Sequence, residues 1–174
     1  MNSVVVTGMG CISAIGRNTA EMAVALKDGR SAIGPLTVTP TDRLTVKIGA
    51  EVADFDPAQH FDEKRLLLLD RFSQFALVAA REAVAASGLE FRGPVGERAA
   101  AILGSGVGGM TTLDESFQRL YLENAKRFQP FIIPKLMMSA AVSHITMEHG
   151  MRGPAFTTAS ACACRATSRK GAVR

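Results

Sequence analysis

A cysteine near the end of the sequence is the residue best placed to do chemistry. Cys162 follows a short β-prone stretch and lies between the small residues Ala161 and Ala163, which let a backbone or a substrate approach the sulfur closely. This pattern is typical of a nucleophile on a strand-to-helix turn, because the N-terminus of a following helix favours the thiolate over the thiol. A lone buried cysteine is more often inert packing. On this segment alone, the inert interpretation is slightly favoured.

The composition indicates a folded α/β protein. The 174 residues are 47% hydrophobic, and the 16 glycines and 7 prolines lie mostly between apolar runs, so they punctuate alternating strands and helices. The net charge of +4 comes from 20 basic and 16 acidic residues. Nucleic-acid binding has little support, because there is one tyrosine and no tryptophan for base stacking. A modest positive charge suits an acidic carrier or a phosphorylated substrate.

Cysteine usage indicates a reducing compartment. Cys11, Cys162 and Cys164 form no even disulfide framework, and no signal peptide precedes Val4, so we expect a cytoplasmic protein with free thiols. The apolar stretches are shorter than the roughly 20 residues that a membrane span needs, and we expect no such span. The three histidines are not at metal-ligand spacing from the cysteines, which argues against a zinc site.

A glycine turn follows the first predicted strand. Residues 3–7 are a β-branched run that predicts a buried strand, and Gly8 and Gly10 end it. This pair lacks the third glycine of a dinucleotide loop, and no phosphate-loop lysine follows. We therefore expect no cofactor.

Helices and extended segments alternate along the rest of the chain. The clearest helix is residues 70–87, where apolar residues recur at three- and four-residue steps before Gly88. A helix over residues 135–149 should stop at Gly150, with His144 partly buried and hydrogen-bonded and His149 solvated. The other predicted elements are a helix from Asn18 or Thr19 to Asp28, an extended segment at 46–52, a strand at 99–103 and a helix at 112–123.

Two loops have compositions that suggest a ligand. Residues 104–109 read Gly-Ser-Gly-Val-Gly-Gly directly after a predicted strand, and such a loop often borders a ligand. In residues 128–134, two prolines bracket Phe131, Ile132 and Ile133, which predicts an extended apolar patch. Exposing that patch is costly without a partner or an acyl ligand, although a core-crossing loop fits the physics equally well.

Several segments, in order, resemble one family. They are Val4-Val-Val-Thr-Gly-Met-Gly10, Asp70-Arg-Phe72, Gly104-Ser-Gly-Val-Gly-Gly109, Pro130-Phe-Ile-Ile-Pro134, and Gly153-Pro154 ahead of Cys162. Together they are similar to the N-terminal half of a β-ketoacyl-acyl-carrier-protein synthase, above all the type II condensing enzyme of fatty acid synthesis, from residue 4 to residue 163. So many motifs at compatible spacings outweigh the inert interpretation of Cys162.

The resemblance implies a fold and a reaction. The fold is the thiolase-like layered α/β fold, usually a homodimer, with residues 1–163 as its N-terminal domain. It implies that Cys162 accepts an acyl chain as a thioester from acyl carrier protein or coenzyme A. That acyl group is then condensed with the carbanion released when malonyl-carrier protein loses carbon dioxide. Acyl carrier protein and acyl and malonyl thioesters would be the partners.

The resemblance also implies an acyl pocket. Val107 resembles the residue at its end, and Phe131, Ile132 and Ile133 resemble the loop that lines it, partly from the neighbouring subunit. Bulk at these positions limits chain length, since each accommodated methylene contributes about 0.8 kcal/mol. The two histidines and the lysine that assist decarboxylation belong to the family's second half and cannot be carried over to the histidines here. We therefore expect no complete condensation by this chain alone.

After Ala163 the sequence departs from the family's pattern. Family members continue into a buried helix of small and apolar residues, whereas residues 164–174 contain Arg165, Arg169 and Lys170, whose unpaired burial costs several kcal/mol each. An atypical basic tail is therefore predicted, as a frameshift or an interrupted gene would produce. The alternatives to a condensing enzyme are a non-catalytic remnant, a dimerisation or binding module, and a polyketide-type ketosynthase fragment.

Overall fold

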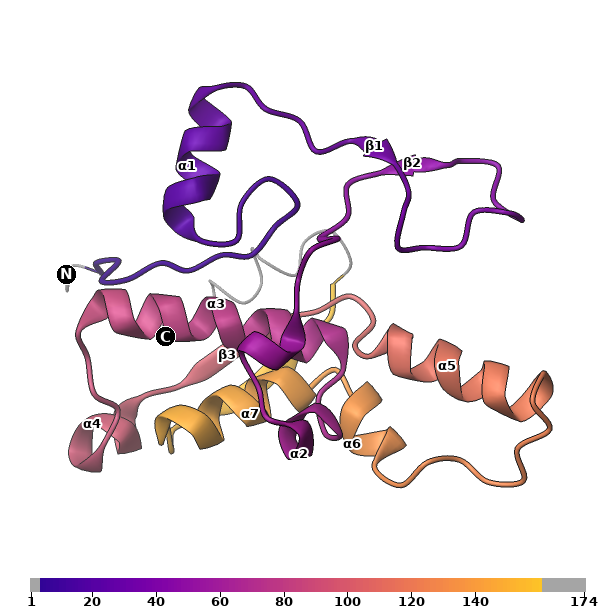
Figure 1. Ribbon diagram of the computed structural model, residues 1–174. Helices are drawn as coiled ribbons and strands as arrows, with labels where there is room; N and C mark the ends of the chain where they lie inside the picture. The colour runs from indigo at the N-terminus through magenta and orange to yellow at the C-terminus, as the bar shows by residue number, and fades with distance from the viewer. Residues whose placement is uncertain (1–3, 161–174) are drawn as a thin grey trace. The chain divides into compact units, whose positions relative to one another are not determined.

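The computed structural model of this chain describes residues 4–160 (Figure 1). Two compact units divide the chain. Of the described residues, one unit contains 4–60 and 78–89, and the other contains 61–77 and 90–160. Helix α3 (Arg71–Ser87) contributes to both units. Among the described residues, no helix is both long enough and apolar enough to cross a membrane.

The helix of the first unit has the local signals that the sequence predicts. α1 (Thr19–Lys27) begins at Asn18, whose side chain accepts a hydrogen bond from the Glu21 N–H at 2.8 Å. Gly29 follows its end with φ +64°, a left-handed conformation that glycine adopts without steric cost. The predicted bounds of this helix are confirmed to within one residue.

Of the two strand predictions in this unit, one is partly confirmed and one is wrong. Its remaining elements are β1 (Gly34–Pro35), β2 (Ile48–Gly49), which pairs antiparallel with β1, and the 3-10 helix η1 (Pro57–Gln59). The extended segment predicted at 46–52 is therefore only partly a strand. The strand predicted at 3–7 is wrong: no described strand pairs with residues 4–7, and a strand needs a ladder partner for its backbone groups.

The glycine turn packs against the second part of α3. A Cβ on either Gly8 or Gly10 would overlap a carbonyl oxygen of that helix. Glu82 of the same helix accepts backbone N–H groups from Cys11 at 3.0 Å and from Thr19 at 2.8 Å. These contacts explain the glycines by close packing of the chain on a helix.

The second unit is a parallel strand pair with helices around it. Its elements are α2 (Glu63–Leu66), the first part of α3, α4 (Gly93–Arg98), β3 (Ala101–Gly104), α5 (Met110–Tyr121), α6 (Ile132–Leu136), α7 (Ala140–His149) and β4 (Ala155–Thr158). β3 and β4 are parallel, which requires a long crossover connection, and α7 packs against both strands. Among the residues of this unit that the structure describes, the buried apolar ones are Phe61, Leu69, Leu77, Ala140, Ala141 and Val142.

Two predictions for residues 128–149 are wrong. The helix predicted over 135–149 is two helices, because Met137 between them has φ −58° and ψ 136°. The predicted extended shape of residues 131–133 is also wrong, since Pro134 lies in the first turn of α6, where its missing N–H costs no intrahelical hydrogen bond. The stops at Gly88 and Gly150, both with positive φ, are confirmed.

Candidate active site

β4 carries the chain toward Cys162. Its last residue, Thr158, accepts a hydrogen bond from the Ser105 N–H at 3.1 Å. The neighbouring Thr157 hydroxyl donates to the Met138 carbonyl at 3.2 Å. Cys162 itself lies outside the described residues, so its role stays a prediction. β4, the strand before Cys162, is hydrogen-bonded to the segment after β3 and to the segment between α6 and α7.

The segment after β3 is the glycine loop, residues 104–109. Gly108 has φ +85°, and a Cβ on it would lie 2.6 Å from the Leu136 carbonyl oxygen. Gly109 N–H donates to that same oxygen at 3.0 Å. Glycine is required here because the loop backbone touches the backbone of α6. Val107, whose side chain is 64% exposed, is the large apolar side chain that the loop presents.

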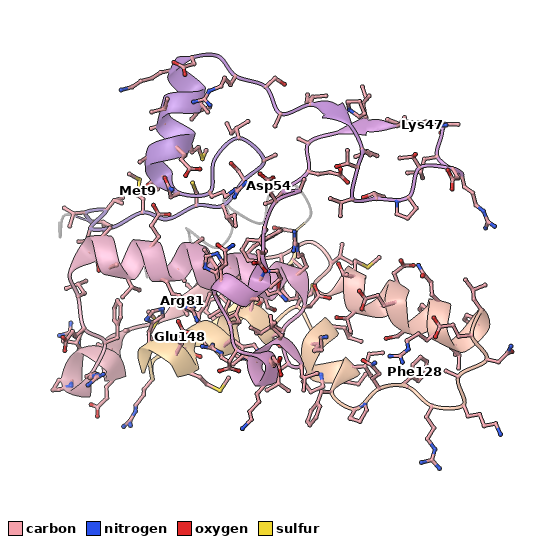
Figure 2. All side chains as sticks on the ribbon, in the orientation of Figure 1. Met9, Lys47, Asp54, Arg81, Phe128 and Glu148 are labelled. Atoms are coloured by element: carbon pink, nitrogen blue, oxygen red, sulfur yellow. The ribbon has the colours of Figure 1, made fainter. Side chains whose placement is uncertain are left out.

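α6 presents the other predicted pocket residues. Phe131 precedes the helix with φ +68°, a conformation that costs a residue with a side chain about 1–2 kcal/mol. Phe131 and Ile133 are both more than half exposed, whereas Ile132 is half-buried. Figure 2 shows Phe128 on the connection between α5 and α6, where its ring lies 6.5 Å from that of Phe117.

The structure thus brings the two predicted pocket segments together. Val107 and Ile132 lie on segments that share the hydrogen bond between Gly109 and Leu136, and α5 also packs against α6. The same α6–α7 connection binds Thr157 of the strand that leads to the predicted nucleophile. The glycine loop and α6 therefore contact each other, and both are tied to segments that contact β4.

Sequence reasoning missed the role of Asp70. The motif Asp70-Arg-Phe72 was part of the resemblance, but no function was predicted for its carboxylate. Asp70 is only 3% exposed, and its Oδ2 accepts the Thr112 N–H at 2.7 Å. An aspartate immediately before a helix is a recognisable N-cap signal. That it also caps a second helix depends on tertiary packing and leaves no local signal.

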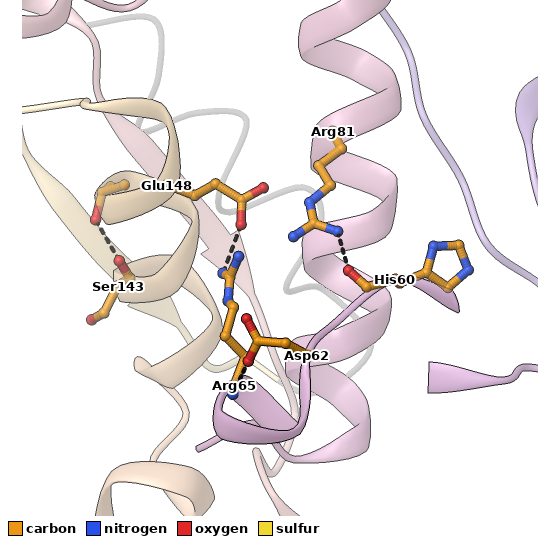
Figure 3. Close-up of polar contacts among 7 residues, drawn as sticks. His60, Asp62, Arg65, Arg81, Ser143 and Glu148 are labelled. Carbon is orange, nitrogen blue, oxygen red and sulfur yellow. Dashed lines mark hydrogen bonds and ion pairs between the residues drawn. The ribbon is translucent and has the colours of Figure 1, made fainter. Parts of the chain in front are cut away.

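Of the two histidines of α7, His144 lines a cavity of about 300 Å³. His144 is half-buried and hydrogen-bonded to the Leu68 backbone, as predicted; burial first and the Arg65 charge second lower its pKa. Arg65 forms an ion pair with Glu148 at 2.6 Å (Figure 3). The prediction that His149 is solvated is wrong, because its Nε2 is buried and has no hydrogen-bond partner among the described residues. Within residues 4–160, no group of three His, Cys, Asp or Glu side chains could hold a metal ion.

Family membership follows from comparison of the sequence. It matches the family described as "Beta-ketoacyl synthase, N-terminal domain" over residues 1–171. The chain belongs to this family. The fold is accordingly the thiolase-like α/β fold of the ketosynthases, represented by its N-terminal half.

Two curated relatives cover most of the chain. Nodulation protein E of Rhizobium sp. (strain N33) is 39% identical over 160 residues, which are 92% of this chain and 40% of that protein. The 3-oxoacyl-[acyl-carrier-protein] synthase 2 of Coxiella burnetii (strain RSA 493 / Nine Mile phase I) is 34% identical over 159 residues, 91% of this chain and 38% of that protein. The chain thus spans about two fifths of the length of these relatives.

Solved structures agree on the fold. The ishigamide ketosynthase/chain length factor is similar with a TM-score of 0.77 and 28% identity, covering 97% of this chain and 44% of that one. A type II polyketide synthase acyl-carrier protein in complex with its ketosynthase (AntDE:AntF) has a TM-score of 0.74 and 20% identity, covering 95% of this chain and 44% of that one. At that lower identity, the likeness concerns the fold alone.

Proposed function

We propose that this chain is the nucleophile-bearing part of a 3-oxoacyl-[acyl-carrier-protein] synthase of fatty acid biosynthesis. The observation that carries the proposal is the convergence of the glycine loop and α6 beside the strand that leads to Cys162. Membership of the ketosynthase family and a relative named 3-oxoacyl-[acyl-carrier-protein] synthase 2 support the same reaction class.

In the first proposed step, the Cys162 thiolate attacks the carbonyl carbon of an acyl thioester. The bond from that carbon to the donor sulfur breaks, and the donor leaves as the thiol of acyl carrier protein or coenzyme A. A thiolate is the reactive form of cysteine, and its formation at a helix N-terminus requires no strong base. The acyl chain then lies along the apolar residues Val107, Phe131, Ile132 and Ile133.

In the second proposed step, malonyl-carrier protein loses carbon dioxide and the resulting carbanion attacks the Cys162 thioester. A carbon–carbon bond forms, and Cys162 is released as a thiolate. The family implies that this step needs two histidines and a lysine outside the segment matched here. We expect the 174-residue chain alone to load an acyl group slowly and to make no 3-oxoacyl product.

The loading step is tested by intact-protein mass spectrometry after incubation with an acyl-coenzyme A or an acylated carrier protein, followed by peptide mapping. We expect one acyl group on Cys162, with loading abolished in Cys162→Ala and kept in Cys164→Ala. Cys11 is an internal control, because burial first and the Glu82 and Glu21 carboxylates next raise the pKa of its thiol. Acylation that persists in Cys162→Ala contradicts the proposed loading step. Formation of a 3-oxoacyl product by the chain alone contradicts the expectation for the second step.

A polyketide-type ketosynthase is the second candidate, because similar solved structures include ketosynthases named with a chain length factor or a polyketide carrier protein. The two candidates differ in the acyl group that they carry forward. A fatty-acid enzyme takes up a fully reduced acyl chain, whereas a polyketide enzyme takes up an unreduced 3-oxoacyl chain. Competition between saturated and 3-oxoacyl donors of equal length for Cys162 decides between them; preference for the saturated donor supports the first.

A further inference from the structure

A buried carboxylate lies between the start of α3 and the start of α5. The Asp70 side chain is 3% exposed, and its two oxygens accept backbone N–H groups from different helices. Oδ1 accepts from Phe72 of α3 at 3.2 Å, and Oδ2 accepts from Thr112 of α5 at 2.7 Å. Carboxylate bonds to helix N-terminal N–H groups are charge-assisted and stronger than neutral ones. Asp70 therefore fixes the first turn of α5 to the beginning of α3.

The first turn of α5 continues directly from the glycine loop. Gly109 immediately precedes α5, and a Cβ on it would lie 3.1 Å from Asp70 Cγ and 2.7 Å from Leu136 Cα. Asp70, Gly109 and the end of α6 are therefore packed against one another with no room for another side-chain carbon. The Gly109 N–H bond to the Leu136 carbonyl, at 3.0 Å, completes the contact.

We infer that Asp70 is a positioning residue for acyl-chain selection: its carboxylate sets the place of the glycine loop that presents Val107 relative to α6. The inference rests on the proposed function, because it assigns the pocket residues an acyl ligand. A shift of this loop moves Val107 and changes the length of chain that fits, while the sulfur of Cys162, on a different segment, keeps its chemistry.

Asp62 provides a matched control within the same unit. Its carboxylate also accepts a backbone N–H, that of Arg65 at 2.8 Å, and caps α2 (Figure 3). This cap is exposed and local, whereas the Asp70 bond to Thr112 joins segments far apart in the sequence. Removing Asp62 therefore takes away a helix cap without touching the glycine loop.

The experiment compares the 174-residue wild type with Asp70→Asn, Asp70→Ala and Asp62→Ala. One measurement is the relative rate of Cys162 acylation by short and long saturated acyl-coenzyme A donors. The other is hydrogen exchange of backbone amides in residues 105–113, which needs no activity. Asp70→Asn keeps an oxygen acceptor for Thr112 and serves as the conservative variant if Asp70→Ala does not fold.

We expect Asp70→Ala to alter the long-to-short rate ratio by at least about fivefold. It should also speed exchange of the hydrogen-bonded amides of Gly109 and Thr112 about tenfold or more, as loss of a charge-assisted bond implies. Asp70→Asn should lie between Asp70→Ala and wild type, and Asp62→Ala should match wild type in both measurements. An unchanged rate ratio in the Asp70 variants, or an equal change in Asp62→Ala, overturns the inference. If the wild type accepts no acyl donor, the proposed function fails, and so does the acyl role of Val107. Independently of acylation, exchange that stays as slow as in wild type in both Asp70→Asn and Asp70→Ala refutes the positioning role.

Discussion

Glu51 shows how a single exposed carboxylate organises a loop. Its Oε2 accepts N–H groups from Thr37 at 2.7 Å and Val38 at 3.1 Å, and its Oε1 accepts from Thr39 at 3.0 Å. These bonds favour the charged form, Thr37 contributing most, and lower the pKa of Glu51 from 4.5 to about 2. The carboxylate substitutes for the ladder partner that this irregular stretch does not have.

The resulting pH dependence has a definite sign. Because the folded-state pKa lies below the unfolded value, the contribution of Glu51 to stability is present above about pH 4.5 and is lost as the pH falls toward about 2. We expect Glu51→Gln to speed amide exchange at residues 37–39 near neutral pH and to remove this acid-dependent loss. NMR exchange measurements from pH 7 to pH 3 check it, with Glu90→Gln as an exposed control; protection unchanged in Glu51→Gln refutes it.

His144 is a base whose charged form the fold disfavours, yet its contribution to stability also decreases as the pH falls. Burial, and then the charge of Arg65, lowers its pKa, while its bond to the Leu68 backbone and the Glu148 carboxylate oppose the shift. Below its unfolded pKa of about 6.5, the unfolded chain binds the proton more readily than the folded chain. Folding stability should therefore decrease as the pH falls below 6.5.

Urea unfolding at pH 7.5, 6.5 and 5.5 measures this effect. We expect His144→Gln to reduce the loss of unfolding free energy over this interval, since the glutamine does not titrate. His60→Gln, which changes an exposed histidine, should retain it. Identical pH slopes in wild type and His144→Gln contradict the assignment.

At the scale of elements, the glycine loop depends on two kinds of glycine. Gly108 combines a positive φ with a Cβ position 2.6 Å from the Leu136 carbonyl oxygen, whereas a Cβ on Gly106 meets nothing within 4 Å. We expect Gly108→Ala to lower the free energy of unfolding by at least about 1–2 kcal/mol and Gly106→Ala to change it by less than about 0.5 kcal/mol. Chemical denaturation of both variants tests this; equal effects would show that the loop does not lean on α6.

Elements with local signals were predictable from the sequence. α1 and α3 have a capping residue or a spaced apolar face and end at a glycine, and these features act within a few residues. The prediction of a strand at residues 3–7 was wrong because β structure depends on a partner elsewhere in the chain. The break between α6 and α7 at Met137 was missed for the related reason that tertiary contacts, here those of Leu136 with the glycine loop, overrule helical periodicity.

The candidate site likewise has parts that the sequence predicts and a part that depends on tertiary contacts. Motif spacing selected the glycine loop and α6, and the structure joins them by the hydrogen bond of Gly109 to Leu136. Asp70, whose carboxylate contacts this loop, belongs to the motif Asp70-Arg-Phe72, yet its bond to Thr112 joins two helices. Sequence spacing identifies segments that meet a ligand, but it does not identify the buried polar group that holds the segments in place.

At the scale of the whole chain, exposed apolar side chains are the dominant feature. In one unit Val4, Val5 and Val6 are consecutive and largely exposed. In the other, Tyr121 and Leu122 are more than 70% exposed at the end of α5. Monomeric proteins rarely leave large apolar surfaces in water, so we expect the isolated chain to associate with itself or with chaperones.

Leu122 offers a direct test of that association. Burying an exposed leucine contributes about 1.5–3 kcal/mol, so Leu122→Lys should weaken self-association about tenfold, whereas Gln129→Lys adds the same charge on the same connection between α5 and α6 without removing apolar surface. Light scattering coupled to size-exclusion chromatography over a concentration series measures the difference, and sulfate should strengthen association of the wild type because it favours burial of apolar groups. A wild-type chain that stays monomeric at every concentration and melts in one sharp transition contradicts this expectation.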